Sequence, residues 1–121
     1  MDMKDTLSIR STFASLTGRA NESLGSFDES NIGIGRYIPG ASPWERHNNG
    51  DELLYVTDGE VQIEVLSDSG VSSIEQLREG SLFVVPRGQW HQLTAKDNVN
   101  ILYISPGEDG VDRQREHPFE Q

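Results

Sequence analysis

The chain of 121 residues contains no cysteine. This absence excludes disulfides, thiolate zinc sites, iron–sulfur ligation and cysteine nucleophiles. Without cysteine, the sequence gives no information on the redox state of the protein's compartment. Basic residues are also scarce, with 10 Lys and Arg against 20 Asp and Glu and a formal net charge of −10. Because this excess repels phosphates and anionic lipid headgroups, and no Lys/Arg cluster opposes it, we expect no nucleic acid and no membrane as a partner.

Long hydrophobic runs are missing as well. Hydrophobic residues make up 34% of the chain, in short segments that never approach membrane-spanning length. The first ten residues mix Asp2, Lys4, Asp5 and Arg10 without an apolar stretch, unlike a secretory signal. We therefore expect a cytoplasmic protein with one compact domain.

Short apolar segments of period two recur between Ile32 and Ser105, separated by Gly, Pro, Asn and Asp. This pattern is typical of short antiparallel strands, and it predicts about eight of them with no long helix. The segment Leu82–Val85 is apolar on both faces, which predicts a buried central strand. The fold class indicated is all-β, as a small β-barrel or sandwich closed like a jelly roll.

We divide the chain into three parts. Residues 1–30 form an N-terminal segment, in which Leu7, Ile9, Phe13 and Leu16 suggest a strand or short helix while 18–30 has a loop composition. Residues 31–106 form the barrel core. Residues 107–121 form an acidic C-terminal tail, expected to be loose and to leave His117 in solvent.

One group of polar residues has the spacing of ligands. Glu45 and His47 are two residues apart on a predicted strand, so both side chains leave the same face, with Cα atoms about 6.5–7 Å apart. If residues 48–51 form a four-residue turn, Glu52 lies opposite His47 across a hairpin, with Cβ atoms about 4.5–5.5 Å apart. A single histidine on a strand usually packs or faces solvent, but this spacing brings three potential ligands together.

The same residues carry a resemblance to a known family. The segment Glu45-x-His47-x4-Glu52-x6-Gly59 resembles the first cupin motif, whose usual form is His-x-His-x3–4-Glu-x6-Gly.

A second segment agrees with the first. The segment Gly80-x5-Pro86-x-Gly88-x2-His91 resembles the second cupin motif, Gly-x5-Pro-x-Gly-x2-His-x3-Asn. Two motifs at matching spacings are more specific than either alone, and together they cover residues 40–95. The resemblance is to a small single-domain cupin of the germin-like or RmlC-like type. It implies one cupin barrel, a double-stranded β-helix or jelly roll, with a metal site inside.

The resemblance also implies a ligand set. His47, Glu52 and His91 match the family's positions, whereas Glu45 replaces the first histidine and Ala95 stands where the second motif has Asn. The implied metal ligands are therefore Glu45, His47, Glu52 and His91. Two carboxylates neutralise a divalent ion, which weakens it as a Lewis acid and favours Mn²⁺ or Fe²⁺, with Ni²⁺ and Zn²⁺ as further candidates.

Glu45 has two other possible roles. As a general base off the metal, it would leave His47, Glu52 and His91 as a two-histidine, one-carboxylate triad, which suits non-haem Fe(II) and O₂. Alternatively the metal is lost and Glu45 bonds a neighbour in an empty pocket. Two facing carboxylates repel without a cation, although an inward-facing Arg36 would also neutralise them.

The aromatic residues near these motifs have structural interpretations. Trp44 and Trp90 each neighbour a proposed ligand but alternate to the opposite face, which predicts packing rather than contact with a ligand. The parity of Tyr37, Tyr55 and Tyr103 places none of them inside, so core packing is the expectation.

The sequence supports three functional hypotheses. The first is a divalent-metal-dependent, dioxygenase-like enzyme that acts on a small organic molecule and assembles as a homodimer. The second is a non-catalytic cupin that binds a small ligand, with or without metal. The third is a sugar isomerase or epimerase, for which no acid–base pair is evident beyond the metal cluster.

Overall fold

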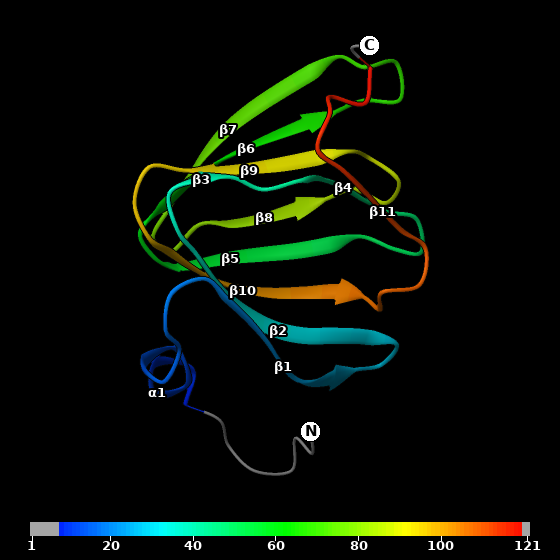
Figure 1. Cartoon of the computed structure of the whole chain (residues 1–121). Helices are drawn as coiled ribbons and strands as arrows, with labels where there is room; N and C mark the ends of the chain where they lie inside the picture. Colours follow the sequence, from blue (N-terminus) through cyan, green and yellow to red (C-terminus); the bar gives the residue numbers. More distant parts are fainter. Residues whose placement is uncertain (1–7, 120–121) are drawn as a thin grey trace.

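The computed structural model describes residues 8–119, which form two antiparallel sheets that face each other, with one short helix outside them (Figure 1). The elements in chain order are α1 (Ile9–Ala14), β1 (Ala20–Phe27), β2 (Ser30–Tyr37), β3 (Gly40–Ala41), β4 (Trp44–His47), β5 (Glu52–Asp58), β6 (Glu60–Leu66), β7 (Ser72–Arg78), β8 (Leu82–Val85), β9 (His91–Ala95), β10 (Val99–Pro106) and β11 (Val111–Gln114). The five-stranded sheet has the order β1-β2-β10-β5-β8, and the six-stranded sheet has the order β11-β4-β9-β6-β7 with β3 beside β9. The predicted all-β jelly-roll fold is confirmed.

Alternation along the strands builds the core between the sheets. In β6, Val61, Ile63 and Val65 are buried while the residues between them are partly exposed, and β10 shows the same alternation. Period-two burial of this kind places every second side chain of each strand in the interior. The inward-facing apolar side chains of both sheets therefore form one core between them.

The N-terminal segment differs from the expectation. Residues predicted as a loop form β1, which pairs with β2 from Ala20 opposite Arg36 to Phe27 opposite Ser30. Asn, Ser and Gly disfavour strands locally, so only the pairing with β2 reveals this one. The predicted helix or strand is a six-residue helix, α1, while Leu7 lies outside the described residues. No helix in the described range is long and apolar enough to cross a membrane.

Helix α1 covers the outer face of the five-stranded sheet, where Phe13 is buried with Leu24 and Ile34. Arg36 lies on this outer face and donates hydrogen bonds to the backbone oxygens of Leu16 and Phe13, at 2.7 and 2.8 Å. A cation at the C-terminal end of a helix satisfies carbonyl groups that lack helical partners. The inward-facing Arg36 considered from the sequence is therefore wrong.

Strand β8 is an edge strand rather than the predicted central one. It pairs with β5 and has no second neighbour among the described strands. Leu82 and Val84 are 60% and 46% exposed, whereas Val85 is buried. A continuous apolar run cannot by itself distinguish a strand buried on both faces from an edge strand with an apolar outer face.

The acidic tail expected to be loose contains a strand. Strand β11 pairs with β4, from Val111 opposite His47 to Gln114 opposite Trp44. Asn48 and Asn49 donate side-chain hydrogen bonds to the backbone oxygens of Gly110 and Asp109, both at 2.8 Å.

His117 also lies against the domain rather than free in solvent. Its ring packs edge-on against Trp44, with centroids 5.0 Å apart. Trp44 and Trp90 form a buried cluster with Leu66, which confirms their predicted packing role. The described part of the tail, up to residue 119, is thus attached to the six-stranded sheet.

Candidate metal centre

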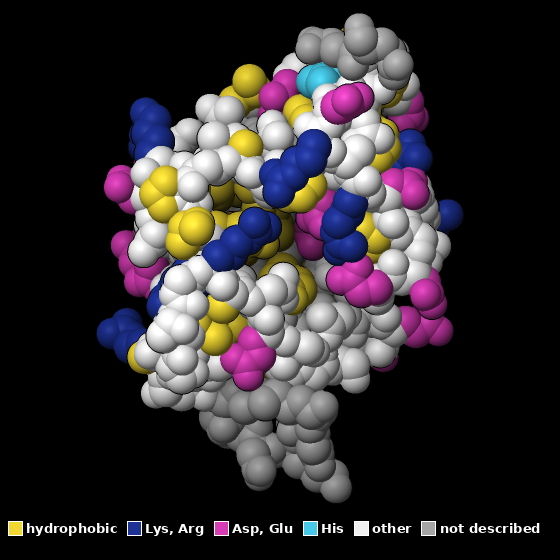
Figure 2. Space-filling model, viewed as in Figure 1, with side chains coloured by type: hydrophobic (Ala, Val, Ile, Leu, Met, Phe, Trp, Pro, Cys, Tyr) yellow, Lys and Arg dark blue, Asp and Glu magenta, His cyan; other side chains and the backbone are white. Residues whose placement is uncertain are grey.

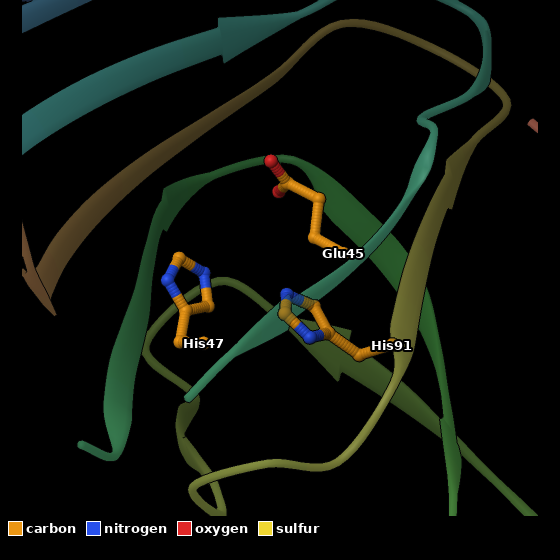
Figure 3. A group of neighbouring side chains, drawn as sticks. All are labelled: Glu45, His47 and His91. Atoms are coloured by element: carbon orange, nitrogen blue, oxygen red, sulfur yellow. The ribbon is translucent and has the colours of Figure 1, made fainter. Parts of the chain in front are cut away.

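Three of the four predicted ligands lie on one sheet. Glu45 and His47 project from β4, and His91 projects from β9, where it is the register partner of Glu45. One potential ligand atom from each of these residues lies within 4.8 Å of those of the other two. Figure 3 shows the three side chains extending into the same space. The structure therefore confirms the shared face of Glu45 and His47 and brings His91 to it.

Glu52 reaches the same place from the opposite sheet. Its Oε2 lies 3.5 Å from His47 Nε2, and its Oε1 lies 3.2 Å from His91 Nε2. The proposed hairpin pairing of His47 with Glu52 is wrong, because β4 and β5 belong to different sheets. Residues 48–51 carry the chain from one sheet to the other, so the two side chains meet across the barrel interior.

The two imidazoles are buried and poorly satisfied. His47 and His91 are 7% and 3% exposed, and their rings stack with centroids 5.6 Å apart. His47 Nδ1, His47 Nε2 and His91 Nδ1 make no hydrogen bond. Leaving a buried polar atom unpaired costs about 1–3 kcal/mol, so three such atoms together need an explanation.

A divalent ion bound at the Nε2 atoms would satisfy one of the three, His47 Nε2. Two donors bound to one ion at about 2.1 Å lie about 3.0–3.4 Å from each other for bond angles between 90° and the tetrahedral value. Glu52 Oε1 lies 3.2 Å from His91 Nε2, which is within this range, and Glu52 Oε2 lies 3.5 Å from His47 Nε2, just above it. Imidazole nitrogens and carboxylate oxygens are also the donors that Mn²⁺, Fe²⁺, Ni²⁺ and Zn²⁺ share. These residues fit a metal ion.

Glu45 has a partner that sequence reasoning missed. Arg113 on β11 is its register partner and donates from Nε to Glu45 Oε2, while Nη2 donates to Glu108 Oε2 at 2.8 Å. The cation that balances Glu45 is thus Arg113 rather than Arg36. No sequence signal marked it, because a strand was not expected in the acidic tail.

A cavity of about 490 Å³ opens beside these residues. Leu54 and Leu93 contribute apolar walls. The polar wall comes from amide and hydroxyl side chains on β1, β2 and β10, namely Asn21, Ser23, Asn31 and Ser105. A few polar groups on a partly apolar wall are usual for a small-molecule site.

Tyr37 and Tyr103 pack against the core and also line this cavity. Tyr55 does not line it. The hydroxyl of Tyr103 donates to Asn21 Oδ1. Burial, together with the negative charge of Glu52, raises the pKa of both Tyr37 and Tyr103 above the ordinary value. Both phenols therefore stay protonated at neutral pH, as hydrogen-bond donors. The prediction of core packing was incomplete for these two.

The cavity continues toward the molecular surface. A neighbouring space of about 440 Å³ shares Asn21, Tyr37, Glu45 and Arg113 with it, and Arg19 lies on its border. Figure 2 shows a hollow near the middle of this face, with Lys or Arg side chains around it. Arg19 and Arg113 thus lie among carboxylates here, with Glu45 and Glu108 on the same walls.

Comparison with known families gives one match. A protein-family model described as "Cupin domain" matches residues 33–105 of this chain. This range includes Glu45, His47, Glu52 and His91 but not β11. The search of curated proteins found no match.

Solved structures show the same fold. A cupin-2 domain-containing protein from Shewanella frigidimarina has a TM-score of 0.71 and 22% identity, covering 83% of this chain and 93% of the other. A protein from Neisseria meningitidis has a TM-score of 0.70 and 18% identity, with coverages of 85% and 100%. Hydroquinone 1,2-dioxygenase from Sphingomonas sp. TTNP3, with 4-hydroxybenzoate bound, has a TM-score of 0.65 and 20% identity, with coverages of 76% and 68%.

Proposed function

The chain belongs to the cupin family, and on this basis we propose that it is a divalent-metal-dependent, dioxygenase-like enzyme acting on a small organic molecule. The observation that carries the proposal is the Glu52 carboxylate, which lies 3.5 Å from Nε2 of the buried His47 and 3.2 Å from Nε2 of the buried His91. His47, Glu52 and His91 hold the metal, and Glu45 is the fourth residue of the site. The ion is Mn²⁺, Fe²⁺, Ni²⁺ or Zn²⁺.

The cavity supports a small organic substrate. Similar folds carry such molecules, since the hydroquinone dioxygenase holds 4-hydroxybenzoate and an oxalate oxidase of TM-score 0.66 holds glycolate. The phenol of Tyr37 can donate a hydrogen bond to a substrate oxygen, whereas the hydroxyl of Tyr103, which donates to Asn21 Oδ1, can accept one. Leu54 and Leu93 give the cavity apolar walls against which the hydrocarbon part of such a molecule can pack.

A bound divalent transition metal would supply Lewis-acid activation and, if redox-active, electron transfer to O₂. The protein's own contribution is to present an accessible carboxylate beside the site. The Glu45 side chain is 27% exposed, whereas that of Glu52 is 11% exposed. Glu45 can therefore accept a proton from a substrate in the cavity and release it to solvent.

Elemental analysis of the purified protein tests the metal site. We expect about one transition-metal ion per wild-type chain after dialysis without chelator, and loss of that ion in His91→Ala because one of three ligands is removed. His117→Ala is the matched control, since its histidine packs on Trp44 away from the site. Equal metal content in wild type and His91→Ala contradicts the proposal, as does a wild type that takes up none of the four ions.

Oxygen consumption tests the catalytic part. We expect the Fe²⁺-loaded protein to consume O₂ with a hydroquinone or a small hydroxy acid, and the His91→Ala variant to consume none. If the loaded protein binds 4-hydroxybenzoate but consumes no O₂ with any such probe, a non-catalytic binding protein replaces the enzyme.

We also propose that the protein is a homodimer joined through β8. This edge strand exposes Leu82 and Val84, and its outer backbone groups have no strand neighbour within the described chain. Exposed apolar edge strands tend to pair with another chain, and a second copy with the same edge satisfies both at once.

A further inference from the structure

Three side chains form a row across the six-stranded sheet. Arg113 on β11 is in register with Glu45 on β4, and Glu45 is in register with His91 on β9. Cross-strand neighbours on one face lie close enough to interact directly. Glu45 therefore has a cation on one side and a candidate metal ligand on the other.

The two carboxylates of the site have different partners. Both oxygens of Glu52 face imidazole nitrogens, at 3.2 and 3.5 Å. In contrast, Glu45 Oε2 accepts a hydrogen bond from Arg113, whose guanidinium is held from its other side by Glu108. Because a guanidinium stays charged and offers a rigid set of donors, it competes with a metal for the carboxylate.

The backbone fixes Arg113 in this place. Strand β11 is paired with β4 along its whole length, and Asn48 and Asn49 bind the loop that precedes it. Arg46 adds an ion pair with Asp112 at 2.6 Å. Arg113 is therefore presented by an ordered strand, although that strand lies outside the matched cupin region.

We propose that Arg113 is a positioning residue that holds the Glu45 carboxylate off the metal, so that His47, Glu52 and His91 alone coordinate it. The inference rests on the proposed metal site and deepens it. It assigns Glu45, which replaces the first histidine of the cupin motif, to the cavity rather than to the metal. Coordination by three protein ligands leaves positions open for substrate, and Glu45 as a fourth ligand would reduce their number.

Removing Arg113 gives a directional test. We measure the dissociation constant and the visible spectrum of Co²⁺ in the wild type, Arg113→Gln, Glu45→Gln and the double variant. Arg113→Gln frees Glu45, whose carboxylate can then join the metal. We expect Co²⁺ to bind about tenfold more tightly, at the lower end of the range over which neighbours of ligands change metal affinity. The d–d bands should weaken, because Co²⁺ with more ligands absorbs less.

The double variant separates coordination from simple charge repulsion. If Glu45 becomes a ligand, the tenfold gain disappears when Glu45→Gln is added; if Arg113 only repels the ion, the gain persists and the inference is overturned. Weaker binding in Arg113→Gln also overturns it, because Arg113 would then support Glu45 as a ligand. Binding of Co²⁺ to Arg113→Gln with the wild-type dissociation constant overturns the inference too.

Two further variants keep the test informative if Arg113→Gln folds poorly. Glu45→Gln in the otherwise wild-type chain should leave the Co²⁺ spectrum unchanged, and a changed spectrum overturns the inference without any change at Arg113. Arg115→Gln is the control for charge loss on the same segment, since Arg115 donates to the backbone oxygen of Ala41 instead. If the wild type binds no Co²⁺, the metal site itself is refuted. If the wild type binds Co²⁺ but Glu45→Gln alters its spectrum, only the role of Arg113 is refuted.

Discussion

Glycine at position 33 makes room for the phenol that reaches the cavity. Gly33 on β2 is the register partner of Tyr103 on β10. A Cβ atom at position 33 would lie 2.8 Å from Tyr103 Cε1 and closer still to Cζ, so any side chain there overlaps the ring. Because Gly33 has no side chain, the Tyr103 ring can occupy this place and donate its hydrogen bond to Asn21.

Gly33→Ala should therefore force the Tyr103 ring to move. Overpacking of this kind costs about 1–3 kcal/mol, and we expect the free energy of unfolding from urea titrations to fall by that amount. In Gly33→Ala/Tyr103→Leu the combined cost should be smaller than the sum of the single costs, because the shorter side chain leaves space. Gly107→Ala is the control, since its Cβ would meet nothing within 4 Å. Additive costs in the double variant would contradict the explanation.

At the scale of elements, the strands with strong alternation could be predicted and those without it could not. The segments that contain β6 and β10 alternate Val, Ile and Tyr with polar or half-exposed residues, and both strands form with the expected face buried. Strands β1 and β11 are rich in Asn, Ser, Asp and Arg. Their stability comes from pairing with β2 and β4, which local propensity does not contain.

The candidate site could be predicted because it depends on spacing within strands and on the family motifs. Parity placed Glu45 and His47 on one face, and the resemblance added Glu52 and His91. The error concerned how Glu52 arrives, since residue spacing cannot show that a turn passes from one sheet to the other. Arg113 and the two cavity tyrosines were missed because their positions depend on strand pairings distant in sequence.

The attachment of β11 should depend on pH through Asp112. Hydrogen bonds from Arg46 and Asn48 hold the pKa of this carboxyl below its ordinary value. A lowered pKa in the folded state gives stability that is present above the ordinary pKa and is lost as the pH falls through the folded value. Asp112→Asn should therefore lower the urea midpoint modestly at pH 7, and the difference from wild type should shrink below about pH 4.

Urea titrations of wild type and variant across this pH range check the prediction. Asp109→Asn removes a carboxylate from the same segment, where Asp109 binds Asn49 through its backbone oxygen. A deficit in Asp112→Asn that stays constant from neutral to acid pH would show that the carboxyl does not act through its charge.

At the scale of the whole molecule, the exposed edge at β8 predicts the oligomeric state. Light scattering coupled to size exclusion should give twice the chain mass for the wild type and one chain mass for Val84→Lys, because a charge on the edge prevents pairing. Ile74→Lys, at an exposed position on the β7 edge of the other sheet, should remain dimeric. Dimers that persist in Val84→Lys, or a monomeric wild type, would refute the interface.

The division of the ligands between the two sheets has a consequence for folding. His47 and His91 lie on one sheet and Glu52 lies on the other, so the three groups meet only after the sheets have docked. During refolding, far-ultraviolet circular dichroism would follow strand formation, while the Co²⁺ absorption would begin only at docking. The delay between the circular dichroism signal and the Co²⁺ absorption would thus measure the time between strand formation and closure of the barrel.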